Sequence, residues 1–416
     1  MSSAIGSVRL FSPFAKELLG APLLIAIAAV LFAVVAANAS DPGALPALLL
    51  IALLLPLALW RWPVGAIASI FVGAAVPRIS LKLFGLNLKV EHIAVLIVSG
   101  VFVSCFWKRP RPLALPDRFL IGLLVVTYFS SILFSPEPST TLKNAIIFTL
   151  ALSPYWILRV LVSDANILRR AMSLFLAVGA IAGVYGVLCF ISHVLFGTML
   201  GVTYYSDGLP AIHGSQWEPN IFGSFMSCFA AMFLFLAAQT KLARGWYVAG
   251  FLTTFVGAMV SLARAAWIGL VLAAIVGFFL RAGSKDLIRR MLVPASIALC
   301  VVVLGIPLAL RIEPVRERIS TLSTDAVLED PTLVHRLIFI GHALDDISQH
   351  PFFGMGSNSF GVLWDWETDE GVEPAWVGNL FIRIWHDSGI VGLILFVLFL
   401  GSLVSRSWRL VWEPRQ

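Results

Sequence analysis

The stretch Gly245–Leu280, GWYVAGFLTTFVGAMVSLARAAWIGLVLAAIVGFFL, decides the fold class of this chain. It contains two apolar runs, 245–262 and 263–280, with almost no loop between them, and its only charged residue is Arg264. A helix needs about 20 residues to cross the hydrocarbon of a bilayer, so each run has near-spanning length. The stretch therefore predicts a tight hairpin of two transmembrane helices.

The rest of the chain has the same apolar character. Of its 416 residues, 59% are hydrophobic and only 12% are charged, whereas a soluble domain carries about 25% charged residues. Further apolar runs of spanning or near-spanning length lie at about 20–38, 44–59, 63–76, 92–107, 119–134, 142–162, 171–195, 219–238, 291–310 and 379–405. We therefore predict an all-α integral membrane protein with about twelve transmembrane helices, the first of them an uncleaved helix rather than a signal peptide.

The positions of Lys and Arg predict the orientation of the chain in the membrane. If the N-terminus is cytoplasmic, most of the 29 Lys and Arg residues fall in the predicted inner segments, where membrane proteins concentrate them. Orientation thus explains the net charge of +6, and we expect no nucleic-acid partner. Both termini are expected in the cytoplasm.

The runs divide the chain into three parts. Transmembrane helices 1 to 11 are expected over 1–310, a long outer loop over 311–378, and the last transmembrane helix with a cytoplasmic tail over 379–416. A loop of this length in a compact protein is usually functional. Pro331 and Thr332 can open an amphipathic helix within it, and this helix can lie on the outer surface of the membrane. Its predicted apolar stripe is Leu333, Leu337, Ile340, Leu344 and Ile347.

Arg264 is a charged residue at the end of the predicted hairpin. An ionisable group in a membrane is costly, so it favours a functional interpretation. One alternative is an arginine that extends its guanidinium to the interface. The other is a fixed cation for phosphate, because a guanidinium stays charged and binds phosphate oxygens bidentately.

The last helix carries a second group of polar residues. Asn379, Arg383, His386 and Asp387 are spaced so that they share one helix face. A polar stripe on an apolar span indicates contact with protein or with a wet cavity rather than with lipid. The alternative is an Arg383–Asp387 pair that only docks the helix.

Two loop segments add further polar candidates. In GSQWEPN, residues 214–220, Pro219 suits a first helical turn, so Glu218 and Asn220 are expected to point into outer-leaflet space; helix capping alone explains Asn220 better than Glu218. In HPFFGMG, residues 350–356, the glycines permit either a plain turn or a backbone nest that binds an anion.

Several chemistries are absent from the sequence. No His and Cys residues have the spacing of a zinc site, and there is no phosphate-binding P-loop, serine-hydrolase elbow or nucleotide-sugar domain. We therefore expect no metal and no cofactor. An activated substrate must then arrive through the membrane.

Taken in order, these segments resemble the O-antigen ligase and polymerase superfamily of bacterial envelope glycosyltransferases. The matching segments are W-E-P-N ending at Asn220, S-x-x-R-A-A-W with Arg264, the long loop with Arg336, H-P-x-x-G-x-G at 350–356, and N-x-x-x-R-x-x-x-D-S-G-x-x-G from Asn379 to Gly392. The resemblance covers roughly residues 200–400.

The resemblance implies a GT-C-like helical bundle in the bacterial inner membrane, with its active site and its long, partly helical loop on the periplasmic side. It also implies a glycan donor on undecaprenyl pyrophosphate, whose diphosphate Arg264 and Arg336 would hold. The remaining substrate-binding candidates are Asn220, Ser261, Gly354, Gly356, Asn379, Arg383 and His386.

One position departs from the family pattern. Ligase members carry a His-Asn pair at the start of the last motif, and the His is thought to help activate the acceptor; this chain has Gly378 and Asn379. Glu218 and Asp387 are the candidate replacements as general base, with His386 weaker. We favour Glu218, because a carboxylate facing Arg264 stays ionised and can accept a proton.

The expected function is therefore polymerisation of O-antigen or exopolysaccharide repeat units, which joins one lipid-linked oligosaccharide to another. One alternative is ligation of the glycan to lipid A–core. A flippase or transporter of lipid-linked oligosaccharide, or a scaffold whose outer loop binds a partner, are the others. The expected partners are the lipid-linked donor, a glycan or lipid A–core acceptor, the bilayer and a chain-length regulator.

Overall fold

The computed structural model describes residues 63–76, 80–83, 86–96, 98–99, 112–162, 164–204, 210–240, 243–280, 331–368 and 371–412. The chain forms two compact units. Unit 1 comprises residues 1–102 and 157–319, and unit 2 comprises residues 103–156 and 320–416. Each unit is described by itself.

Unit 1 is mostly helical in its described part. Its helices are α4 (Val64–Ala75), α8 (Ala165–Phe196), α9 (Pro219–Gln239), α10 (Arg244–Val260) and α11 (Arg264–Leu280), and its hairpins pair β1 (Ser80–Leu83) with β2 (Leu86–Lys89) and β3 (Val202–Tyr204) with β4 (Pro210–Ile212). Helix α8 shows why such elements begin and end where they do. The Asp164 carboxylate accepts the N–H groups of Asn166 (2.8 Å) and Ile167 (3.0 Å), and Gly197 ends the helix with φ of 66°.

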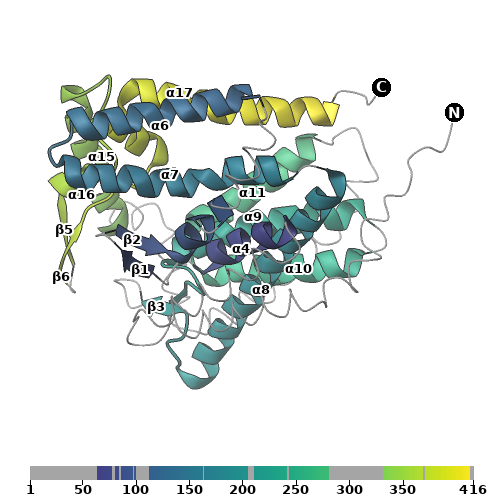
Figure 1. Ribbon diagram of the computed structural model, residues 1–416. Helices are drawn as coiled ribbons and strands as arrows, with labels where there is room; N and C mark the ends of the chain where they lie inside the picture. The colour runs from purple at the N-terminus through teal and green to yellow at the C-terminus, as the bar shows by residue number, and fades with distance from the viewer. Residues whose placement is uncertain are drawn as a thin grey trace. The chain divides into compact units, whose positions relative to one another are not determined.

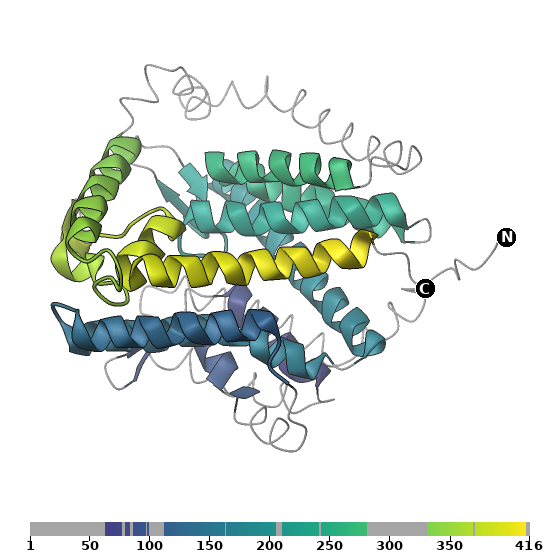
Figure 2. The same ribbon diagram turned by 90° about the horizontal axis from the view of Figure 1, so that it is seen from above.

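Helices α9, α10 and α11 lie side by side in unit 1 (Figure 2). Buried aromatic residues form the core between them, among them Phe222, Phe233 and Tyr247. At Gly250 of α10, an added Cβ would come within 2.5 Å of the Phe233 ring. Small residues thus let the helices approach closely, as they do in membrane proteins generally.

Unit 2 holds the last helix. Its elements are α6 (Leu115–Leu133), α7 (Pro138–Leu161, of which residues up to Trp156 belong here), α15 (Pro331–Gln349), α16 (Phe360–Leu363), the hairpin of β5 (Asp365–Thr368) with β6 (Gly371–Pro374), and α17 (Leu380–Trp412). Helices α6 and α17 lie side by side in both views (Figures 1 and 2). Their shared core consists of Leu120, Leu123, Ile384, Phe396 and Phe399.

Helix α17 is broken at Gly389, whose φ of 66° and ψ of −174° are not helical. The turn that follows α15 completes the hydrogen bonding at this break. The N–H groups of Met355 and Gly356 donate to the carbonyls of His386 (3.0 Å) and Asp387 (2.9 Å). In the other direction, Ile390 N–H donates to Pro351 O (2.9 Å) and Val391 N–H to Phe352 O (3.3 Å). Such replacement partners are what allow a membrane helix to break.

The predicted membrane character is confirmed at a coarse level. Among the described residues, five helices are long and apolar enough to cross a membrane, and the helices match predicted runs closely. These candidate spans are Leu115–Leu133, Pro138–Leu161, Ala165–Phe196, Pro219–Ala238 and Leu380–Ser407. The predicted runs 20–38, 44–59 and 291–310 lie outside the described residues, so the count of about twelve and the GT-C-like bundle stay predictions. The short hairpins were not predicted.

The predicted amphipathic helix begins at Pro331 as expected, and part of its predicted apolar stripe is exposed. Ile347 is buried, whereas Leu337 and Leu344 are exposed. The buried face instead carries Phe339, Ala343, Asp346 and Ile347. The exposed leucines leave an apolar face that suits the predicted position on a membrane surface.

Replacing Gly389 by Ala should destabilise unit 2. A Cβ at this position would collide with the Phe352 carbonyl, so the turn would have to move and leave backbone groups unpaired, at a cost of about 2 kcal/mol or more. We expect a clearly lower melting temperature in detergent. Gly401→Ala on the same helix is the control, because nothing lies within 4 Å of its added Cβ. Equal melting of both variants would contradict this account.

Candidate functional site

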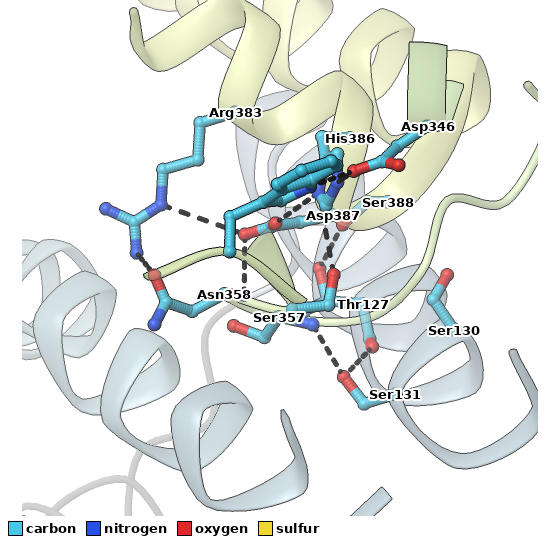
Figure 3. A network of polar contacts seen from close by, with 12 residues as sticks. Thr127, Ser130, Ser131, Asp346, Ser357, Asn358, Arg383, His386, Asp387 and Ser388 are labelled. Atoms are coloured by element: carbon cyan, nitrogen blue, oxygen red, sulfur yellow. Dashed lines mark hydrogen bonds and ion pairs between the residues drawn. The ribbon is translucent and has the colours of Figure 1, made fainter. Parts of the chain in front are cut away.

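A buried polar network surrounds His386 of α17 in unit 2 (Figure 3). His386 is 1% exposed. Its Nε2 lies 3.2 Å from Asp346 Oδ2, and its Nδ1 lies 3.3 Å from Asp387 Oδ1. The Trp364 indole N–H donates to the same Asp346 oxygen at 3.0 Å. The Asp346 carboxylate therefore joins α15 to α17 and to the loop before β5.

The Asp387 carboxylate is also used within the protein. Its Oδ2 accepts the Asn358 N–H at 2.9 Å and lies 3.8 Å from Arg383 Nε. The Arg383 guanidinium donates to the Asn358 side-chain oxygen at 3.0 Å. The predicted Arg383–Asp387 pair thus exists and holds the segment after the turn against α17, as the docking alternative expects.

Hydroxyl groups of α6 complete the network. Thr127 and Ser388 hydroxyls lie 2.9 Å apart, and the Ser131 hydroxyl accepts the Ser357 N–H at 3.0 Å (Figure 3). The Ser130 hydroxyl donates to the Phe353 carbonyl. In this way α6, α15, α17 and the turn between them are cross-linked by buried polar contacts.

Of the two alternatives for residues 350–356, the structure favours the plain turn over the anion-binding nest. Gly354 N–H donates to His350 O (3.1 Å), and the next two N–H groups donate to α17. These donors are therefore not available to an anion. Gly354 and Gly356 are needed for another reason: their φ values are 70° and 94°, and an added Cβ would meet α17 backbone at Gly354 and α6 at Gly356.

Arg336 and Asn379, which the sequence predicts as site residues, lie at one edge of unit 2. Arg336 is exposed on α15, and its side-chain carbons would lie 3.8 Å from a Cβ added to Gly378. Among the described residues, its guanidinium has no hydrogen-bond or ion-pair partner. Asn379 caps α17, because its Oδ1 accepts the N–H groups of Phe381 (3.0 Å) and Ile382 (3.2 Å).

A small apolar cluster holds the start of α15 against the segment before α17. Phe339 of α15 packs on buried Ala343, Phe360, Ala375 and Val377. Phe339 lies one turn after Arg336 on the same helix face. The cluster therefore places the start of α15 beside the segment that leads into α17.

In unit 1, Glu218 is at the N-cap position directly before α9, and Pro219 occupies the first helical position as predicted. The Glu218 carboxylate makes no capping hydrogen bond, and its side chain is half-buried. Asn220 follows inside the helix, so it is not the capping residue. The preceding Ser215 hydroxyl donates to Ala75 O (2.6 Å) and anchors this segment to the end of α4.

Ser261 and Arg264 lie in the predicted hairpin between α10 and α11. The Ser261 hydroxyl is completely buried, donates to Ala258 O (2.7 Å) and accepts the Ala263 N–H (3.3 Å). The Ser261 hydroxyl therefore stabilises the turn, and it is not exposed in the way that the predicted substrate contact requires. Arg264 is half-buried and is the first residue of α11.

The structure brings the two predicted segments of unit 1 together. An added Cβ on Gly223 of α9 would contact the Ser261 hydroxyl and lie 2.9 Å from Ala263 Cβ. One turn later, Ser227 donates to Ala266 O at 2.8 Å. The starts of α9 and α11, with Glu218 and Arg264, are thus at the same end of the unit.

Sequence reasoning missed Asp346. Its position is a weak signal even in retrospect, since Asp345 and Asp346 are adjacent and only the second lies on the face of Ala343 and Ile347. The partner, His386, is distant in sequence.

Asp346→Ala should destabilise the protein far more than Asp345→Ala. The first change leaves the Trp364 indole N–H and the His386 ring without their buried acceptor, which costs roughly 2–4 kcal/mol. Asp345 is exposed and serves as the matched control. Thermal unfolding in detergent measures the difference. Similar melting temperatures for the two variants would show that the network does not hold α15.

Comparison with known proteins adds one family match. Residues 249–397 match the family described as O-antigen ligase. This range starts within α10, ends within α17 and contains Arg264 and Arg336 but not Glu218. No curated protein and no solved structure matches the chain.

The match confirms the resemblance of the motifs, and its range covers the turn with Arg264, helix α15 and the broken helix α17. The match of residues 249–397 thus supports the O-antigen ligase and polymerase superfamily, as the motifs predict.

Proposed function

We propose that this protein is a glycosyltransferase of the periplasmic face of the bacterial inner membrane, which polymerises O-antigen or exopolysaccharide repeat units carried on undecaprenyl pyrophosphate. The family match supports ligase- or polymerase-type activity on lipid-linked glycan in a membrane. The observation that carries the finer proposal is the exposed guanidinium of Arg336, which has no partner among the described residues. The buried cluster holds it beside the first turn of α17.

The reaction needs fixed positive charge at the leaving group. The acceptor hydroxyl attacks the anomeric carbon, the bond from that carbon to the diphosphate oxygen breaks, and its electron pair leaves with the diphosphate. The diphosphate gains negative charge as this bond breaks, so preorganised cations stabilise the transition state. We assign this role to Arg336 and Arg264, with Asn220, Asn379 and Arg383 as substrate contacts.

The position of Arg264 supports a ligand. Arg264 is the first residue of α11, and the N-terminus of a helix carries partial positive charge. An anion bound there would be stabilised, because helix N-terminal N–H groups and a guanidinium act on the same charge.

The acceptor hydroxyl also needs a base. Glu218 lies at the end of unit 1 that carries Arg264, and its carboxylate is not used to cap α9. Asp387 is less suitable, because it is buried and bonded to Asn358 and Arg383. We therefore assign the proton acceptor to Glu218, and the positioning of the turn after α15 to Asp387 and His386.

Polymerisation is favoured over ligation because Gly378 stands where ligase members carry the His of the last motif. No imidazole is available at this position to activate a lipid A–core acceptor. The second candidate is a transporter of lipid-linked oligosaccharide, and the break of α17 at Gly389 favours it, since transporters use broken helices. Here, however, the turn after α15 satisfies the backbone groups at the break, so they are not free for a substrate.

Arg336→Ala and Arg264→Ala should each lower the rate of glycan transfer by about 100-fold or more, because each removes a cation from the leaving group. The assay is purified protein in proteoliposomes with a synthetic undecaprenyl-pyrophosphate oligosaccharide as both donor and acceptor. A polymerase elongates this substrate without lipid A–core, whereas a ligase does not. Arg169→Ala on α8 is the control for loss of a positive charge. Full activity of both site variants would remove the proposed diphosphate site.

Glu218→Gln should reduce the turnover number by about 100-fold to 10,000-fold and leave the KM for the donor nearly unchanged, because the amide keeps the shape of the side chain but cannot accept the proton. Glu137→Gln, an exposed residue before α7, is the control. The initial rate at saturating substrate is the measurement. A rate within two-fold of the original protein would exclude Glu218 as the base.

A further inference from the structure

Gly378 lies next to Trp376 and Arg336, and a methyl group on it would fit without strain. A Cβ added to Gly378 would be 3.7 Å from Cζ3 of Trp376 and 3.8 Å from Cγ and Cδ of Arg336. These are ordinary contact distances, so the space beside the glycine is bordered by an indole ring on one side and by an arginine on the other. Trp376 is 38% exposed.

The segment that leads into α17 holds this arrangement in place. Ala375 and Val377 are buried in the cluster around Phe360, and the Ala375 N–H donates to Trp364 O at 2.9 Å. The residues between and after them, Trp376 and Gly378, are exposed. Burial alternates along residues 375–378, so the Trp376 ring and the bare backbone of Gly378 are both on the exposed side of the segment.

This combination of groups fits a sugar ring. A pyranose has an apolar face of C–H groups and a rim of hydroxyls. An exposed indole presents a large, rigid apolar surface on which the C–H face can pack. A guanidinium presents several N–H donors to which the hydroxyl groups can bond. Trp376 and Arg336 are both exposed, so a ligand can reach the ring and the guanidinium.

We propose that Trp376, Gly378 and Arg336 form a saccharide subsite, in which a sugar ring lies over Gly378, packs on Trp376 and is directly next to the diphosphate. This inference rests on the proposed function, in which Arg336 holds that diphosphate. A side chain larger than the methyl group of alanine at this position would fill the space that the ring needs.

An interfacial membrane anchor is the competing role for an exposed tryptophan. A membrane anchor predicts that Trp376 affects insertion or stability but not the binding of a water-soluble glycan. The two roles therefore differ in a measurable way.

The test uses the full chain in lipid nanodiscs and two soluble probes: the repeat-unit oligosaccharide released from its lipid by mild acid, and inorganic pyrophosphate. Binding is measured by isothermal titration. We expect Trp376→Ala and Gly378→Leu to weaken oligosaccharide binding by about 10-fold and to leave pyrophosphate binding unchanged, while Arg336→Ala weakens pyrophosphate binding. Trp376→Phe should retain most of the affinity. The controls are Trp246→Ala, another exposed tryptophan, and Gly378→Ala, whose Cβ fits without strain.

Kinetic measurements distinguish whether the bound sugar ring belongs to the acceptor or to the lipid-linked donor. A rise in KM for the acceptor alone assigns the ring to the acceptor chain, and a rise in KM for the lipid-linked donor alone assigns it to the donor; either supports the subsite. Unchanged oligosaccharide binding in both Trp376→Ala and Gly378→Leu would overturn the subsite and leave the proposed transfer reaction intact. Loss of binding in these variants would support the subsite even if the original protein showed no transfer.

Discussion

The exchange of backbone hydrogen bonds between the break at Gly389 and the turn after α15 is the interaction on which unit 2 depends. A carbonyl or N–H left unpaired in hydrocarbon costs several kcal/mol, so the break in α17 is stable only with this turn in place. The turn fixes the end of α15, and the Asp346–His386 contact adds a buried polar link one turn earlier. The start of α15, with Arg336, is held in turn by the apolar cluster around Phe360. The position of Arg336 thus depends on the contacts that hold α15 in place, and these include the turn at the break of α17.

Charged groups in this protein divide by what surrounds them. Arg383, Asp387 and Asp346 have partners within unit 2, and their substitution is expected to affect stability first. Arg336 has an exposed guanidinium without a partner among the described residues, and Arg264 stands at the positive end of a helix dipole. Both guanidinium groups can bind phosphate oxygens, which is why the proposed diphosphate site is built on these two arginines.

Hydrophobic run length predicted the described helices well, because a segment that crosses a bilayer must be both apolar and helical. Pro219 at the start of α9 and the Ser261–Ala263 turn were also predicted, since proline position and a lone arginine between two runs are local signals. Leu337 and Leu344 of the α15 stripe are exposed, because an apolar residue in a membrane protein need not pack in the protein core. Residues 350–356 form a turn rather than a nest, and the role of Asp346 was missed, because both depend on where α17 breaks. The Asp346–His386 contact joins residues that are distant in sequence, so no local sequence pattern predicts it.

The central claim is that Arg264 and Arg336 stabilise the leaving diphosphate. A cryo-electron microscopy structure of the protein with bound undecaprenyl pyrophosphate tests it most directly. The account predicts phosphate oxygens within about 3 Å of both guanidinium groups, with Glu218 on the side from which an acceptor approaches. A diphosphate bound elsewhere, or the two arginines on opposite sides of the bilayer, would contradict the account.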